Sequence, residues 1–206
     1  MHPDESNLTG YTQFFDDYSS RGTLAEVFIN KEEGLVRKYY RTNGLTITKK
    51  KPLYNTTNAI ETFFNTDVKW TKQLEGNNIV KLYDYGTIND GFYLLQEYCG
   101  PTILRMYEKE TLHKNIPDIK EQIINLYKTF KEHNIYKCNN AMCNLVSDKN
   151  GIIKAIDFKY TKIRSYNGPV FGLDKNATPR EIETRCIDNW ISKIDPTLPA
   201  ELKKLL

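Results

Sequence analysis

The order of apolar and polar residues predicts three β-hairpins. Each hairpin consists of two strand-like segments that are separated by a short turn sequence, such as Asn-Asp-Gly at 89–91. Tight turns of this type are the strongest local signal for a hairpin. The expected strand pairs are 23–30 with 35–40, 79–85 with 92–98, and 145–146 with 152–158.

Apolar residues that recur every three or four positions predict the helices. The clearest amphipathic stretch is 119–130, which follows Pro117, a residue suited to a first helical turn. Residues 59–75 hold one or two helical segments, with a break expected at 65–67 because polar residues there could cap a second segment. Two short helices are expected at 178–192 and 198–206. The irregular order of strands and helices indicates an α+β chain.

Composition changes this picture by excluding several classes of protein. Hydrophobic residues make up 39% of the 206 positions and charged residues 27%, a balance that excludes a wholly disordered chain. The net charge of +3 does not favour general nucleic-acid binding. No apolar run reaches the roughly 20 residues that cross a bilayer, and the polar start is unlike a secretory signal. We therefore expect a cytoplasmic protein with no membrane and no nucleic-acid partner, whose four cysteines are free thiols.

Candidate chemistry begins at the first hairpin. Gly22 precedes a strand that carries Val27, and Lys38 lies on the strand that follows. A glycine at a hairpin tip lets backbone N–H groups approach phosphate oxygens, and a lysine on a strand adds a positive point charge. By itself this pattern is better explained as an ordinary hairpin with a surface lysine, because Leu24 and Ala25 stand near the tip instead of further glycines.

Two later segments carry polar residues suited to a metal–nucleotide. Asn139 and Asn144 come directly after the long predicted helix, and Asp157 follows across the third hairpin. A carboxylate and a carboxamide oxygen are hard ligands of the kind that Mg²⁺ prefers.

In this order, the segments resemble the protein-kinase-like superfamily, as a small and divergent kinase or pseudokinase. The resemblance is good over residues 20–165. It implies a two-lobed fold in a single domain, 1–206, with an antiparallel β-sheet N-lobe at 21–99. An irregular lead-in at 1–20 precedes that lobe, and a minimal helical C-lobe at 100–206 follows it.

The resemblance also implies roles for individual residues. Lys38 would hold the phosphates of ATP and pair with Asp67, or with Glu61 as the alternative acid. Asn144 and Asp157 would bind Mg²⁺ or Mn²⁺. Gln96 would lie at the back of an adenine pocket, and the main chain of 97–99 would bond the purine edge. The expected nucleotide contacts are therefore Gly22, Val27, Lys38, Asp67, Gln96, Glu97 and Cys99.

Three departures from the family pattern bear on activity. Asn139 stands at the position of the catalytic aspartate, and an amide cannot accept a proton from an attacking hydroxyl. Ala141 replaces a lysine that would steady the phosphoryl group, and Lys159 replaces the glycine of the metal motif. Lys137 either neutralises phosphate in place of the missing lysine or is a solvated surface lysine, which is the interpretation we prefer.

We therefore expect a protein that binds ATP with Mg²⁺ and acts through a protein partner, as a pseudokinase or very weak phosphotransferase. The first alternative is an active atypical transferase that moves a phosphoryl or nucleotidyl group to a protein or small molecule, because a general base contributes only ~10²–10⁴-fold. The second is an interaction scaffold that binds no nucleotide. The Lys-, Asn-, Ile- and Tyr-rich composition suits the AT-rich genome of a virus or phage.

Overall fold

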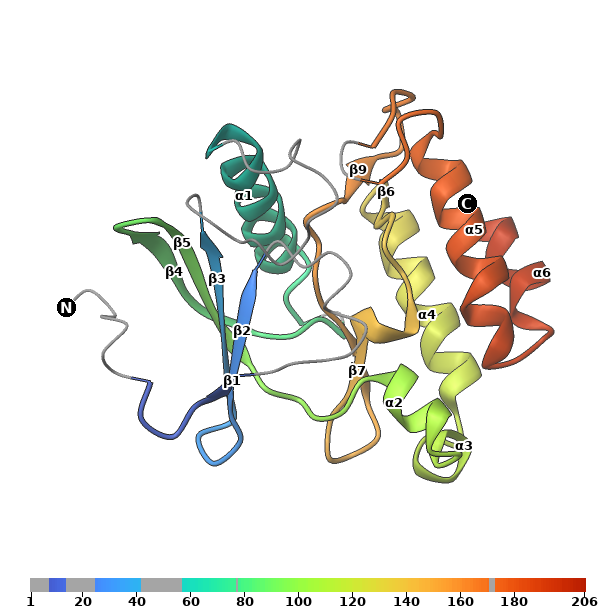
Figure 1. Cartoon of the computed structure of the whole chain (residues 1–206). Coiled ribbons are helices and arrows are strands. Elements are labelled where there is room, and N and C mark those ends of the chain that lie inside the picture. Colours follow the sequence, from blue (N-terminus) through green and yellow to red (C-terminus); the bar gives the residue numbers. More distant parts are fainter. Residues whose placement is uncertain (1–7, 14–24, 42–56, 77, 171–172) are drawn as a thin grey trace. The chain divides into compact units, whose positions relative to one another are not determined.

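The chain forms two compact units in the computed structural model (Figure 1). The first unit comprises Met1–Lys72 and Lys81–Tyr98, and the second comprises Gln73–Val80 and Cys99–Leu206. The chain therefore crosses from the first unit to the second after Lys72, returns to the first at Lys81, and enters the second again at Cys99. The structure describes residues 8–13, 25–41, 57–76, 78–170 and 173–206.

A five-stranded antiparallel sheet forms the first unit, in the order β1-β2-β3-β5-β4. The first two predicted hairpins are confirmed, as β2–β3 and β4–β5. Gly91 begins β5 where a Cβ atom would overlap the carbonyl oxygen of Tyr40 on β3, so only glycine fits there. The strands are β1 (Thr12–Gln13), β2 (Glu26–Asn30), β3 (Leu35–Arg41), β4 (Leu82–Ile88) and β5 (Gly91–Glu97).

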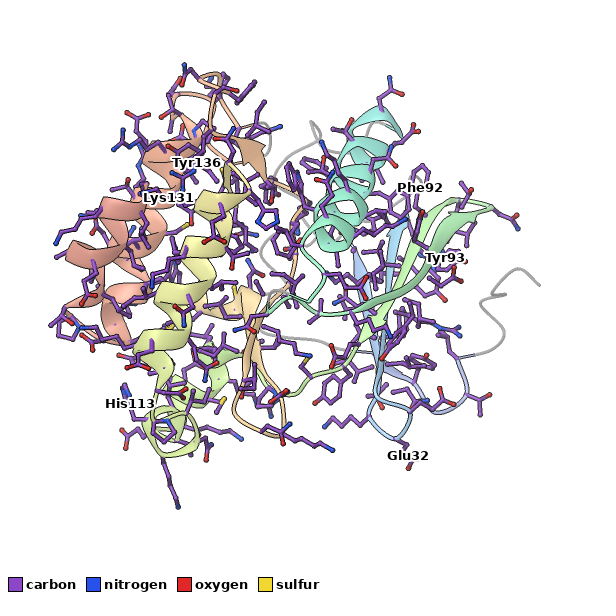
Figure 2. The ribbon with its side chains drawn as sticks, turned by 180° about the vertical axis from the view of Figure 1, so that it is seen from behind. Glu32, Phe92, Tyr93, His113, Lys131 and Tyr136 are labelled. Atoms are coloured by element: carbon purple, nitrogen blue, oxygen red, sulfur yellow. The ribbon has the colours of Figure 1, made fainter. Side chains whose placement is uncertain are left out.

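Helix α1 (Thr57–Gln73) covers one face of this sheet. The ring of Phe64 on α1 stacks on Phe92 of β5, with ring centroids 4.7 Å apart, and meets Tyr40 of β3 edge-on at 5.9 Å. Phe92 is labelled beside α1 in Figure 2. These aromatic contacts bury apolar area between helix and sheet, which is the main favourable contribution to the stability of such a layer.

The break expected at 65–67 is wrong, because α1 is continuous. Buried residues recur along its whole length at helical spacing, so one apolar stripe faces the sheet throughout. The Thr66 hydroxyl donates to the Thr62 carbonyl oxygen at 2.7 Å. Thr66 thus bonds back to its own helix instead of capping a new one.

The second unit is mainly helical. Helix α4 confirms the predicted amphipathic helix, and its buried side chains include Ile123, Leu126 and Phe130. It contacts α6, which in turn contacts α5. Helices α2 and α3 were not predicted; α2 starts at Thr102, whose side chain accepts a hydrogen bond from the Arg105 N–H at 3.2 Å. The helices are α2 (Ile103–Glu108), α3 (Leu112–Asn115), α4 (Ile119–Glu132), α5 (Pro179–Asn189) and α6 (Leu198–Leu202).

Two short strand pairs complete the second unit. The third predicted hairpin is confirmed as β7 (Leu145–Ser147) with β8 (Ile153–Ala155), but β8 is shorter than expected. A second pair joins β6 (Ile135–Tyr136) to β9 (Lys162–Ile163). One loop runs from β6 to β7, and the other runs from β8 to β9. Because β6 pairs with β9 and β7 pairs with β8, the two loops lie side by side.

Two further sequence expectations can be compared with the structure. All four cysteines are free thiols, as predicted. Within the described ranges, no helix has both the length and the apolar character that a bilayer crossing needs.

Candidate functional site

Lys38 is buried on the face of the sheet that α1 covers. The register of the strands places Lys38 beside Val27 of β2 and Leu94 of β5, and cross-strand neighbours point to the same face. The lysine is only 6% exposed. Its Nζ lies 3.6 Å from Oδ2 of Asp67 on α1. The lysine therefore forms a buried ion pair, unlike the surface lysine of an ordinary hairpin.

The partner carboxylate is held by two further side chains. The Tyr40 hydroxyl donates to Asp67 Oδ2 at 2.7 Å, and the Thr71 hydroxyl lies 3.5 Å from Oδ1. Glu61, the alternative acid, is exposed on the same helix. A buried ion pair adds little net stability, because removing both charges from water offsets their attraction. Its presence is therefore more informative about function than about folding.

Two of the expected nucleotide contacts lie close to this ion pair. Val27 is the direct cross-strand neighbour of Lys38. Gln96 pairs with Val36 on β3 and is 3% exposed, so its side chain lies on the same sheet face as Lys38. The first unit thus brings Val27, Lys38 and Gln96 to one face of the sheet, where α1 contributes Asp67.

The remaining expected nucleotide contacts are placed differently. The N–H of Glu97 donates to the Lys81 carbonyl oxygen at 2.9 Å, and its carboxylate accepts from the Lys81 N–H at 3.2 Å. The Glu97 N–H, which was expected to contact the nucleotide, therefore already donates to the main chain of the first unit. Cys99 is half-buried at the start of the second unit. Gly22 lies outside the described residues.

In the second unit, Asn139 and Asp157 come together from the two facing loops. The Asn139 side-chain amide donates from Nδ2 to Asp157 Oδ2 at 3.3 Å. The Asn144 amide donates to the main-chain oxygen of Asn139 at 2.9 Å, and the Asn144 carbonyl accepts from the Ile156 N–H at 3.0 Å. The three residues named by the sequence pattern therefore form one hydrogen-bonded cluster.

Lys159 also belongs to this cluster. Its Nζ lies 2.6 Å from Asp157 Oδ2 and 2.9 Å from Oδ1, and the two side chains are only 9% and 14% exposed. A divalent cation at Asp157 would need the same oxygens. The side chains as they lie therefore do not fit Mg²⁺ or Mn²⁺, and the metal site at Asn144 and Asp157 stays a prediction.

Two residues of the facing loops have strained backbones. Cys138 and Asp157 have φ angles of 62° and 64°, in the left-handed region that residues other than glycine seldom adopt. Each such residue costs about 1–3 kcal/mol, and such strain collects at functional sites. Phe158, which is fully buried and meets Phe130 of α4 edge-on, anchors the chain beside Asp157.

Glu183 of α5 holds one of the strained segments, a role that was not predicted from the sequence. It is 1% exposed, and its carboxylate accepts the Cys138 N–H at 2.6 Å and a side-chain N–H of Asn140. Burial raises the pKa of Glu183, although these two hydrogen bonds partly oppose the shift. Nothing in the local sequence distinguishes Glu183 from exposed Glu181, because the burial depends on tertiary packing.

The expectation that Lys137 is a solvated surface lysine is wrong. Lys137 is fully buried; its Nζ donates to the Asn139 carbonyl oxygen at 3.1 Å and lies 5.2 Å from the centre of the Phe158 ring. An ammonium over an aromatic face is stabilised by the quadrupole of the ring. Lys137 therefore supports the main chain of the loop from inside.

The two units thus each contain one cluster of buried, paired charges. The first is built around Lys38 and Asp67, and the second around Asp157 and Lys159. A scan against models of protein families finds none that matches the chain, and a search of curated proteins finds no match. The residues and their geometry are therefore the grounds for assigning a function.

Proposed function

We propose that the chain is a small kinase-like protein that binds ATP and acts as a pseudokinase, through a protein partner. The observation that carries this proposal is the buried ion pair of Lys38 and Asp67. The proposal includes a kinase-like two-lobed fold.

The ion pair supports nucleotide binding for an electrostatic reason. An ammonium held in a fixed, poorly hydrated position interacts strongly with phosphate oxygens, because little water competes for it. Asp67 fixes the position of Lys38. Val27 and Gln96 on the same sheet face are suited to contact the base, one by apolar contact and the other through an amide.

The cluster around Asn139 supports weak or absent phosphoryl transfer. Asn139 has no carboxylate with which to take a proton from an acceptor hydroxyl. Its side-chain amide donates a hydrogen bond to Asp157 instead. Phosphoryl transfer depends mainly on positioning and charge stabilisation, however, and loss of a base costs only ~10²–10⁴-fold. An active atypical transferase is therefore the second candidate function.

Thermal unfolding with and without ATP tests the binding proposal. At a concentration of about 100 Kd, ATP stabilises the folded state by about 2.7 kcal/mol, which raises the Tm of a chain this size by roughly 5–10 °C. Lys38→Met should abolish the rise, and Lys31→Met, in an exposed turn of the same unit, should retain it. The proposal is contradicted if wild type shows no rise, or if Lys38→Met shows the same rise.

Incubation with labelled ATP separates the two candidate functions. We expect no label on protein or small-molecule acceptors from either the α or the γ position. Label transfer that disappears in Asp157→Ala would identify an active transferase instead. A wild type that neither binds nor transfers nucleotide would fit the interaction scaffold.

A further inference from the structure

We propose that Lys159 supplies, from within the chain, the positive charge that a divalent cation would otherwise bring to Asp157, so that ATP binds without a metal ion. This inference rests on the proposed function, because ATP is the ligand concerned. It concerns the cation beside Asp157 and leaves the role of Lys38 unchanged.

The geometry of the ion pair is that of an occupied cation site. The ammonium lies within hydrogen-bond distance of both Asp157 oxygens, at 2.6 and 2.9 Å, so neither oxygen faces an open position. Mg²⁺ needs its oxygen ligands at about 2.0–2.1 Å and a near-octahedral shell that usually includes water. The ion and the ammonium cannot share these oxygens.

The surroundings keep the ammonium in place. Lys159 is 9% exposed, and its Nζ lies 5.3 Å from the centre of the Tyr160 ring. Only one residue separates it from Asp157, and that residue, Phe158, is fully buried. An internal charge tethered so closely has a high effective concentration at the carboxylate. A metal ion would have to displace it and also lose its own water.

A second donor reinforces this arrangement. The Asn139 amide donates to Asp157 Oδ2, the oxygen that lies nearest to Lys159. The Asn144 amide, the other expected metal ligand, directs its Nδ2 to the Asn139 main chain. The Asp157 carboxylate therefore accepts hydrogen bonds from both Lys159 and Asn139. A cation site would instead need the oxygens of both side chains to converge on an open position.

ATP affinity with and without metal gives the first test. Wild type and Lys149→Met, a control in the exposed β7–β8 turn, should bind ATP equally well in excess Mg²⁺ and in EDTA. Lys159→Met keeps most of the apolar stem and removes the charge, so Mg²⁺ should tighten its ATP binding by about tenfold. Wild-type binding that requires Mg²⁺ would overturn the inference and leave the proposed function standing.

Titration with Mn²⁺ alone, followed by electron paramagnetic resonance, gives a test that needs no nucleotide. Wild type should bind no Mn²⁺, and Lys159→Met should gain one site that the double variant Asp157→Asn, Lys159→Met lacks. A wild-type Mn²⁺ site that Asp157→Asn removes would overturn the inference, even if Lys159→Met does not fold. If ATP binds wild type under neither condition, the proposed function fails, and this titration alone decides the role of Lys159.

Discussion

At the scale of single residues, Asp157 is the point where the polar contacts of the second unit meet. It combines a left-handed backbone with an ammonium on both carboxylate oxygens and an amide on one of them. A strained and fully engaged carboxylate has little freedom to change partners. Changes to its neighbours should therefore affect stability as well as function.

Restoring an acid beside Asp157 should destabilise the protein. Asn139→Asp removes an amide donor and places two carboxylates next to each other, which raises the pKa of one of them. We expect a loss of about 1–3 kcal/mol in unfolding free energy at neutral pH. The loss should shrink in acid, where that carboxyl keeps its proton. Urea denaturation at several pH values measures this, with Asn139→Ala as the control whose loss should not depend on pH.

Glu183 should give folding stability a distinct dependence on pH. Since burial raises its pKa in the folded state, the folded protein keeps a proton that the unfolded chain has already released. The unfolding free energy should therefore fall as pH rises from about 4.5 to the raised pKa and then level off. Glu183→Gln cannot titrate and should lack this slope.

Urea denaturation across the acid range compares wild type with Glu183→Gln. The variant should also lose about 1–3 kcal/mol at all pH values, because an amide can satisfy only one of the two N–H donors. Glu132→Gln, at an exposed position of α4, should keep the wild-type slope. An identical pH slope in wild type and Glu183→Gln would show that folding does not raise the pKa of Glu183, and would contradict this prediction.

At the scale of elements, Asp67 supplies a polar contact between α1 and β3, through Lys38 and Tyr40. Asp67→Asn leaves Lys38 buried without its counter-charge, which should cost about 3–5 kcal/mol. Glu61→Gln changes an exposed acid on the same helix and should stay within about 0.5 kcal/mol of wild type. Chemical denaturation measures both. Equal effects would mean that the ion pair contributes nothing to this layer.

The sequence predicted the elements whose signals are local. Turn residues at 89–91 marked a hairpin, and apolar spacing at 119–130 marked a helix, because both signals depend on near neighbours. The pairing of β6 with β9 was missed, since two-residue strands carry almost no pattern. The break expected in α1 was wrong because Thr66 has the residue type of a cap, while tertiary packing keeps the helix continuous.

The candidate site was predicted in part for the same reason. Asn139, Asn144 and Asp157 were named through the resemblance of their segments to kinase motifs, and the structure joins them by hydrogen bonds. The residues that hold these loops in place could not be predicted from the sequence. Glu183 comes from a distant helix, and the burial of Lys137 depends on packing around the loop.

At the scale of the whole molecule, each unit holds a buried lysine–aspartate pair among its described residues, and these two pairs differ in character. In the first, the Nζ of Lys38 lies 3.6 Å from a single carboxylate oxygen of Asp67. In the second, Lys159 is bonded to both oxygens of Asp157. Under the proposed function, Lys38 would bind the phosphates of the nucleotide, and Lys159 would take the place of a metal ion.

Affinity labelling with an ATP analogue that carries an acyl group on its γ-phosphate tests the nucleotide site most directly. An amine held beside the phosphates attacks the acyl carbonyl, forms an amide and releases ATP, and peptide mass spectrometry then identifies the modified lysine. We predict that Lys38 is acylated and that excess ATP prevents the modification. Acylation confined to exposed lysines such as Lys31 and Lys149, unaffected by ATP, would contradict the account.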